Sequence, residues 1–364
     1  MTDLDALIVL NHLRVGPITT RRLMEHFGSP AAILTAPARD VQRVANISSV
    51  NADRVRNWEK EVKLDKALEI IAQENIRLLT YQDADYPALL KEIYDHPLLL
   101  YVKGQLKPED DQALAIVGTR SPTDYGRTIA RKWATQLASR SFTIVSGLAR
   151  GVDTQAHIGA LEAHGRTIAI LGYGFGYIYP RENERLYYKI LETGAIISEY
   201  PYKRYHGKSS FPLRNRLIAG LSRGTIVVES RRQGGAMITA HFALDYNRTV
   251  YAVPGSLYSA ASAGTNQLIR DGATLVTSVD DITGEFEFLF PPNALEGKPA
   301  TPPLSAKLEG NEQLLIELLL EPLSLDQLAQ QSDLSVEKVM TAMLMLELKG
   351  LVRALPGKMY DRKL

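Results

Sequence analysis

The chain has 364 residues, and its 42 Lys and Arg against 41 Asp and Glu leave a net charge of +1, which argues against a uniformly basic nucleic-acid coat. This length predicts two or three domains, and an apolar fraction of 45% is that of a globular protein. The absence of cysteine excludes disulfides, a thiolate nucleophile and cysteine-based zinc sites, and it indicates a reducing compartment.

Residues 1–75 predict a helical module that resembles a SAM or helix-hairpin-helix domain. Apolar residues follow helical spacing in "LDALIVLNHLRVG" and "TTRRLMEHFGSPAAIL", with breaks at Gly16-Pro17 and at Gly28 to Pro30. The acidic start and the lack of an apolar run of 18 residues predict neither a secretory signal nor a membrane span, so we expect a cytoplasmic protein. The hairpin could offer N–H groups to DNA phosphates, or the module could serve packing or interaction.

Residues 76–290 predict an α/β class core, an extended Rossmann-like domain with a mainly parallel sheet. Near-continuous apolar runs alternate with helical stretches, which is typical of a parallel sheet covered on both faces. The expected strands are 76–81, 98–104, 114–120, 142–147, 166–174, 195–200, 225–230, 249–255 and 274–279. The expected helices are 125–140, 153–164, 183–193, 212–222, 237–247 and 265–271.

Residues 291–309 hold five prolines and predict a linker, and residues 310–364 predict a winged-helix domain. In the second domain Ser324 and Gln327 fit a capping box, and Pro356-Gly357 fits a tight turn between two short strands. The longer helix offers Lys338 against two acids, Glu337 and Glu347. A protein-interaction or dimer role therefore competes with reading of duplex DNA.

Small residues follow three of the expected strands, each just before a helix. Because ligands of open parallel sheets bind at the carboxyl ends of the strands, and helix N-termini favour anions, these loops predict a site for a phosphate-bearing ligand. The candidate residues of these loops are Gly118 and Arg120, then Ser146, Gly147 and Gly151, then Gly234 and Gly235.

Common cofactor and catalytic motifs do not fit. "GYGFG" at 172–176 has the wrong spacing for a dinucleotide fingerprint, and no P-loop is present, so no cofactor is expected. Ser146, Asp153 and His157 could be drawn as a triad, but no G-x-S-x-G elbow accompanies them. His157 and His164 lack the spacing of a zinc site, so no metal is expected.

The segment 201–232 concentrates positive charge beside aromatic rings. It carries eight Lys or Arg and one acid, Glu229, which gives a local net charge of +7, and it includes Phe211, Tyr202 and Tyr205. Cations along the backbone and rings under the bases are how proteins hold single-stranded nucleic acid without sequence preference.

Five motifs together resemble the DNA-processing protein A family (DprA, also called Smf) over roughly residues 80 to 280. They are "AIVGTRSPTDYGR", "IVSGLARGVDTQAHIGAL", "FPLRNRLIAGLSRGTIVVES", "GGAMITAHFALDYNR" and "VYAVPGS…SAGTNQLIRDGA". The resemblance implies a protein without catalytic turnover that binds single-stranded DNA during natural transformation. It also implies loading of the RecA recombinase onto that DNA, work beside single-strand binding protein, and a homodimer or higher assembly.

The resemblance also implies the residues that contact DNA. Arg120 matches a family arginine that contacts the DNA backbone. Lys208 and Phe211 match a family lysine and an aromatic residue that contact a phosphate and a base. Arg214, Asn215 and Arg216 match the "RNR" core of the same motif. One of these two arginines could instead face inward on a carboxylate such as Glu199 or Glu229.

The alternative is an enzyme that acts on nucleotides. The sheet also resembles that of the cytokinin-activating phosphoribohydrolases, in which a glycine-rich helix start precedes a catalytic glutamate. Here "GGAMITA" has no acid at that place, and Asp245 comes too late on the helix. This absence disfavours the hydrolase.

Overall fold

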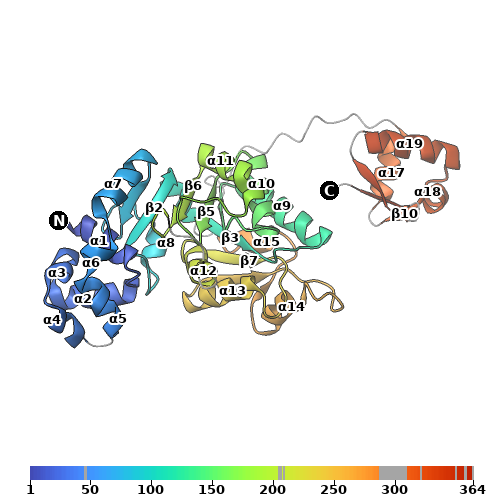
Figure 1. Cartoon of the computed structure of the whole chain (residues 1–364). Coiled ribbons are helices and arrows are strands. Elements are labelled where there is room, and N and C mark those ends of the chain that lie inside the picture. Colours follow the sequence, from blue (N-terminus) through green and yellow to red (C-terminus); the bar gives the residue numbers. More distant parts are fainter. Residues whose placement is uncertain are drawn as a thin grey trace. The chain divides into compact units, whose positions relative to one another are not determined.

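The computed structural model describes residues 1–44, 47–203, 207, 210–286, 310–319, 322–348, 351–355 and 359–362. Two compact units make up the chain, Met1–Ala300 and Thr301–Leu364, and each is described by itself (Figure 1). Among the described residues, no helix combines the length and the apolar character that crossing a membrane requires.

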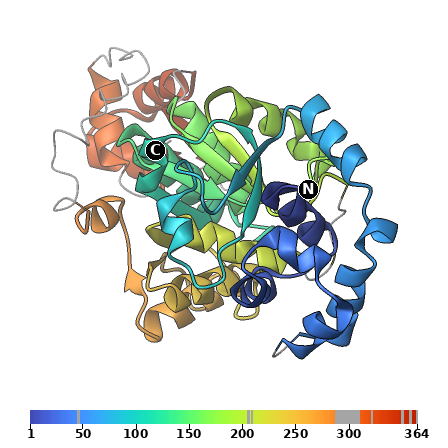
Figure 2. The ribbon, with the colours of Figure 1, turned by 90° about the vertical axis from the view of Figure 1, so that its left-hand side faces the viewer.

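The first unit begins with short helices, as the sequence predicts. They are α1 (Asp3–His12), α2 (Pro17–Phe27), α3 (Pro30–Thr35), α4 (Ala38–Arg43), α5 (Ser49–Arg56), α6 (Trp58–Glu61) and α7 (Leu64–Gln73). They enclose an apolar cluster of their own that includes Val9, Leu23 and Ile33. Figures 1 and 2 place them on the β1–β2 side of the sheet, where the Asn11 side chain donates to the Glu199 carbonyl at 2.9 Å.

A nine-stranded sheet forms the centre of this unit, in the order β1-β2-β6-β5-β4-β3-β7-β8-β9. Its strands are β1 (Arg77–Thr80), β2 (Leu99–Gly104), β3 (Ala113–Val117), β4 (Thr143–Ser146), β5 (Thr167–Leu171), β6 (Ala195–Ser198), β7 (Gly224–Val227), β8 (Thr249–Ala252) and β9 (Thr274–Leu275). The strands from β6 to β9 in this order are parallel, and β2 joins β6, and β1 joins β2, in antiparallel pairing.

Helices cover both faces of the sheet (Figure 1). They are α8 (Ala88–Lys91), α9 (Asp124–Ser139), α10 (Val152–Glu162), α11 (Glu184–Thr193), α12 (Ser210–Gly220), α13 (Gly235–Asp245), α14 (Ala263–Arg270) and α15 (Asp280–Thr283), with 3-10 turns η1 (Pro108–Gln112) and η2 (Arg181–Asn183). Leu217 of α12 and Ala240 of α13 belong to one core cluster, and Trp133 of α9 and Ala156 of α10 to another.

The predicted mainly parallel α/β fold is confirmed, because buried strands read as apolar runs and their crossovers as helices. β9 ends at Leu275, before the predicted limit of residue 279. The strand order reverses at β3, which pairs with β4 on one side and β7 on the other. Such a switch point opens a crevice at the carboxyl ends of the strands, which positions a ligand site there.

The second unit has the elements of a winged helix. They are α17 (Asn311–Leu318), β10 (Leu323–Ser324), α18 (Leu325–Ser332), α19 (Val336–Leu348), β11 (Val352–Leu355) and β12 (Met359–Arg362). The predicted capping box is present, since the Ser324 hydroxyl accepts from the Gln327 N–H and the Gln327 side chain from the Ser324 N–H. The predicted linker at 291–309 and the turn at Pro356-Gly357 lie outside the described residues.

Candidate functional site

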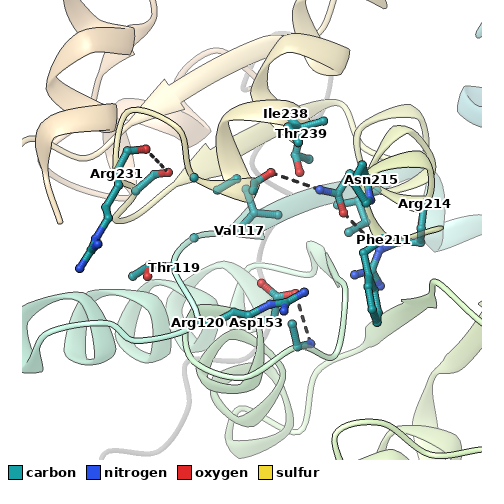
Figure 3. A pocket seen from close by; sticks show the side chains of 18 of the residues that line it. Val117, Thr119, Arg120, Asp153, Phe211, Arg214, Asn215, Arg231, Ile238 and Thr239 are labelled. Atoms are coloured by element: carbon teal, nitrogen blue, oxygen red, sulfur yellow. Dashed lines mark hydrogen bonds between the residues drawn. The ribbon is translucent and has the colours of Figure 1, made fainter. Parts of the chain in front are cut away.

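A cavity of about 680 Å³ opens at the carboxyl ends of β3 and β7 (Figure 3). We call it the strand-end cavity. It is bounded by the loop after β3, the first turns of α12 and α13, and the loop after β7. The candidate residues that line it are Gly118, Arg120, Phe211, Arg214, Asn215, Gly234 and Gly235. Two of the three loops that the sequence singled out, those after β3 and β7, therefore supply candidate residues to a common space, with α12 closing one side.

Arg120 is the exposed cation of the cavity rim. Its guanidinium carbon lies 5.3 Å from the centre of the Phe211 ring, at cation–π distance, and not against a carboxylate of the described residues. Glu229 fixes the loop that carries Arg120. Its carboxylate accepts hydrogen bonds from the Thr123 N–H at 2.9 Å and from the Thr123 hydroxyl at 2.6 Å. Arg120 is thus held in place while its donors face the cavity (Figure 3).

Phe211 is a half-buried ring on the first turn of α12. Its ring centre lies 5.8 Å from that of Tyr179 and 6.4 Å from that of Tyr173. A side chain at Gly172 would meet the Phe211 ring at 2.8 Å, so glycine there is required by the close approach. The ring is therefore ordered by its neighbours before any ligand arrives, which lowers the entropy cost of stacking a base on it.

Arg214 lines the cavity but is only 3% exposed to solvent. Its guanidinium donates to the Gly147 carbonyl at 2.7 Å and also to the Ile170 carbonyl. Burial lowers the pKa of Arg214, while the nearby Asp153 opposes this shift. Burial likewise raises the pKa of the Asp153 carboxyl, against the charge of Arg214 and the N–H bonds that it accepts. Arg214 serves mainly to tie α12 to the ends of β4 and β5.

Arg216, a predicted DNA contact, does not line the strand-end cavity. It is 5% exposed and donates to both carboxylate oxygens of Glu199 at 2.6 Å and to the Asp95 carbonyl at 2.8 Å. This is the inward arrangement on Glu199 that the sequence left open for one arginine. The reason is geometric, because residues two apart on a helix point about 200° from each other.

Three of the predicted DNA contacts, Ser146, Gly147 and Gly151, lie in the loop after β4 and make internal contacts. The Ser146 hydroxyl, fully buried, donates to the Ile116 carbonyl at 2.7 Å, and the Gly147 N–H donates to Asp153 at 3.0 Å. Gly151 has φ +82°, and a side chain there would collide with the Thr119 backbone carbonyl. None of the three lines the cavity, and their contacts shape the loop after β4, so their contact with DNA stays a prediction.

The loop after β7 combines a predicted and a missed contribution. Gly235 has open space where a side chain would be, and its carbonyl accepts from the Asn215 side chain at 3.2 Å. Arg231, exposed at the opposite end of the cavity from Phe211, was counted in the basic segment but not proposed as a site residue (Figure 3). Its position directly after a strand was the available signal. Lys208 lies outside the described residues.

Ser146, Asp153 and His157, which could be drawn as a catalytic triad, each make internal hydrogen bonds instead. His157 is fully buried, with Nδ1 2.7 Å from the Thr167 hydroxyl and Nε2 accepting from the Leu148 N–H at 3.3 Å. Burial lowers the pKa of His157 to about 3, so it is neutral near pH 7. Among the described residues that line the cavity, Asp153 is the one acid. The arrangement offers cations, N–H groups and a ring, which suits binding of an anionic, base-bearing chain.

Comparisons with known proteins agree with this chemistry. A family model described as DNA recombination-mediator protein A matches residues 77–287, and one described as DprA winged helix domain matches residues 298–358. The chain is 34% identical to Protein Smf of Synechocystis, covering 96% of both sequences. It is also 34% identical to DNA processing protein DprA of Bacillus subtilis, covering 77% of this chain and 95% of the relative.

Two solved structures share the fold. The X-ray structure of DNA processing protein A from Streptococcus pneumoniae has a TM-score of 0.69 at 33% identity and covers 79% of this chain and 99% of that one. A structure of DNA processing protein A from Helicobacter pylori, reported for its single-stranded DNA binding mode, has a TM-score of 0.52 at 32% identity. It covers 58% of this chain and 95% of that one.

Proposed function

The chain belongs to the DNA recombination-mediator protein A family, which confirms the resemblance drawn from its motifs, and from this premise we propose that it binds single-stranded DNA in the strand-end cavity. The observation that carries the proposal is the exposed Arg120 guanidinium held over the Phe211 ring. A cation beside a pre-ordered ring is the pairing that holds a phosphate and its base together.

The division of labour within the cavity follows from burial. Arg120, and Arg231 at the far end, offer exposed guanidinium groups to phosphates, while Phe211 offers its ring to a base. Backbone N–H groups near Gly234 and Gly235 add to the positive field where α13 begins. Stacking and phosphate contacts are indifferent to sequence, so we expect weak sequence preference and strong salt dependence.

The cellular role that we propose extends this binding. The relatives of Bacillus subtilis and Streptococcus pneumoniae are DNA processing proteins, and the matching model describes a recombination mediator. We place the protein in the cytoplasm, where it would receive single strands in natural transformation and load the RecA recombinase onto them beside single-strand binding protein. It would act without catalytic turnover and as a homodimer.

The test is fluorescence anisotropy with labelled single-stranded and duplex oligonucleotides at two salt concentrations. Arg120→Ala should weaken single-strand binding about tenfold and lower the log–log salt slope by roughly 0.7, the value for one phosphate. Phe211→Leu keeps an apolar side chain in the same packing but removes the π face. It should weaken binding about 5- to 150-fold, because stacking is worth about 1–3 kcal/mol per base.

Matched controls are Arg270→Ala, an exposed arginine on α14, and Tyr94→Leu, an exposed ring near α8. Both should bind as the parent does. If Arg120→Ala and Phe211→Leu also bind single strands as tightly as the parent, the cavity is not the DNA site. Release of ribose or phosphate from a nucleotide by the parent would replace the proposal with the hydrolase.

A further inference from the structure

The segment 172–180, "GYGFGYIYP", is the glycine-rich motif that the cofactor fingerprint did not explain. It leaves the carboxyl end of β5 and passes under Phe211, whose ring lies where a side chain at Gly172 would be. Gly174 leaves no room for a side chain against the Pro201 carbonyl, and the Gly176 N–H donates to the Tyr202 carbonyl at 2.7 Å. The glycines thus let the segment run closely from Phe211 to residues 201 and 202.

A second cavity, of about 520 Å³, is lined in part by residues 175–178 in the middle of this segment. We call it the tyrosine cavity, because most of the aromatic side chains lining it are tyrosines. The described rings that line it are Phe175, Tyr177, Tyr187, Tyr188 and Tyr202. Tyr177 is 40% exposed and Tyr188 56% exposed. Tyrosine is enriched at binding surfaces, where its ring offers a flat apolar face and its hydroxyl a polar end.

Two rings of the segment 172–180 lie near the two cavities. Tyr179 lies 5.8 Å from Phe211 between ring centres, and Tyr177, two residues earlier in the same segment, lines the tyrosine cavity. Both cavities lie beside loops at the carboxyl ends of parallel strands. The segment 172–180 thus connects the neighbourhood of Phe211 with the tyrosine cavity along the chain.

The charges of the tyrosine cavity are balanced, unlike those of the strand-end cavity. Lys103 pairs with Glu74 at 2.9 Å and lies 5.5 Å from the centre of the Phe175 ring. The Tyr202 hydroxyl also donates to Glu74 at 2.7 Å, and this bond is the main cause that lowers the pKa of Glu74. The other charged residues that line the cavity, Arg181 and Glu184, are of opposite sign. Attraction here must come from the rings.

We propose that the tyrosine cavity is a second, ring-based section of the single-strand path, on which bases beyond the strand-end cavity stack against Tyr177 and Tyr188. The inference rests on the proposed function, because it continues the strand that Phe211 and Arg120 hold. It assigns the two cavities different chemistry, with phosphates bound at the first and base faces at the second.

Oligonucleotides of about 5 and about 16 nucleotides, the two ends of the site sizes of single-strand binders, separate the sections. Anisotropy is measured with the full chain carrying Tyr177→Ala, Tyr188→Ala or both. Each single change should weaken binding of the long oligonucleotide about tenfold, with the short one unchanged. The salt slope for the long oligonucleotide should stay at the parent value, because no phosphate contact is lost.

Tyr188→Phe, which keeps the ring, should bind as the parent does, and Tyr94→Ala, at another exposed tyrosine, is the matched control. The inference is overturned if the alanine variants bind the long oligonucleotide as tightly as the parent while Phe211→Leu does not. It is also overturned if their loss is equal for both lengths, or if the salt slope falls with it. Failure of the parent to bind either oligonucleotide would instead remove the proposed function itself.

Discussion

Arginines lie both at the rim of the strand-end cavity and in the interior behind it, but they differ in what they contact. At the rim Arg120 is exposed and lies over a ring. In the interior Arg214 and Arg216 are 3% and 5% exposed, and they donate to carbonyls and to a carboxylate. In one basic motif, some residues can therefore bind the ligand while others hold in place the loops that bind it. The following experiments test this division.

The largest effect is expected from Arg216→Met. It would leave the Glu199 carboxylate buried without its partner, and removal of one member of a buried pair costs about 3–5 kcal/mol. The free energy of unfolding, from urea denaturation at pH 7, should fall by that amount. Burial raises the pKa of Glu199 and Arg216 opposes this, so without Arg216 the carboxyl takes up a proton more readily. The deficit should therefore shrink as the pH falls.

If Arg216→Met instead unfolds with the midpoint of the parent and loses DNA affinity alone, the assignment of Arg216 to the interior is wrong. The exposed Arg270→Met serves as the comparison, since its side chain contacts only Gln267 of its own helix among the described residues.

His157 tests the interior through pH. Its pKa is lowered from 6.5 to about 3 in the folded chain by burial, so the unfolded chain binds its proton more readily. The free energy of unfolding is therefore at its full value above pH 6.5, and it falls as the pH drops from 6.5 towards 3. For this one group, the free energy of unfolding should drop by about 2 kcal/mol between pH 7 and pH 5. Denaturant titrations of the parent, His157→Gln and the exposed His241→Gln measure it. An equal slope in all three would contradict the expectation.

Ser146 should affect stability but not binding. Ser146→Ala removes a hydroxyl that donates to the buried Ile116 carbonyl, a bond worth about 1 kcal/mol net. The unfolding free energy should fall by that amount with single-strand affinity unchanged, whereas the exposed Ser49→Ala should change neither. A loss of affinity at unchanged stability would return Ser146 to the set of DNA contacts.

The smallest effect on stability belongs to the rim. Arg120→Ala removes an exposed side chain, so the free energy of unfolding should stay within about 0.5 kcal/mol of the parent. Thermal unfolding without DNA measures this on the same sample that is used for anisotropy. A large loss of stability together with weaker binding would show that Arg120 supports the loop rather than the ligand.

The sequence predicted the fold closely because buried parallel strands have a plain apolar signature, as in "LAIVGTR" and "TIVVES". It also brought Arg120, Phe211 and Gly235 to the same place, because residues after parallel strands meet at one edge of the sheet. It could not tell that both Arg214 and Arg216 are buried, since Arg216, for example, finds Asp95 and Glu199 at separations of 121 and 17 residues along the chain. The sequence also could not show that Ser146 and Gly147 make internal hydrogen bonds, because small residues suit internal contacts and ligand contacts equally well.

The order of the strands also bears on how the protein folds. β3 lies between β4 and β7, and Leu114 of β3 pairs with Gly224 of β7, which comes much later in the sequence. Closing so long a loop costs entropy before the contact forms, so we expect this pairing to form late in folding. Residues of α12 and α13 reach the loop after β3 only once it is made. A nascent chain released before β7 would contain Arg120 but no cavity around it.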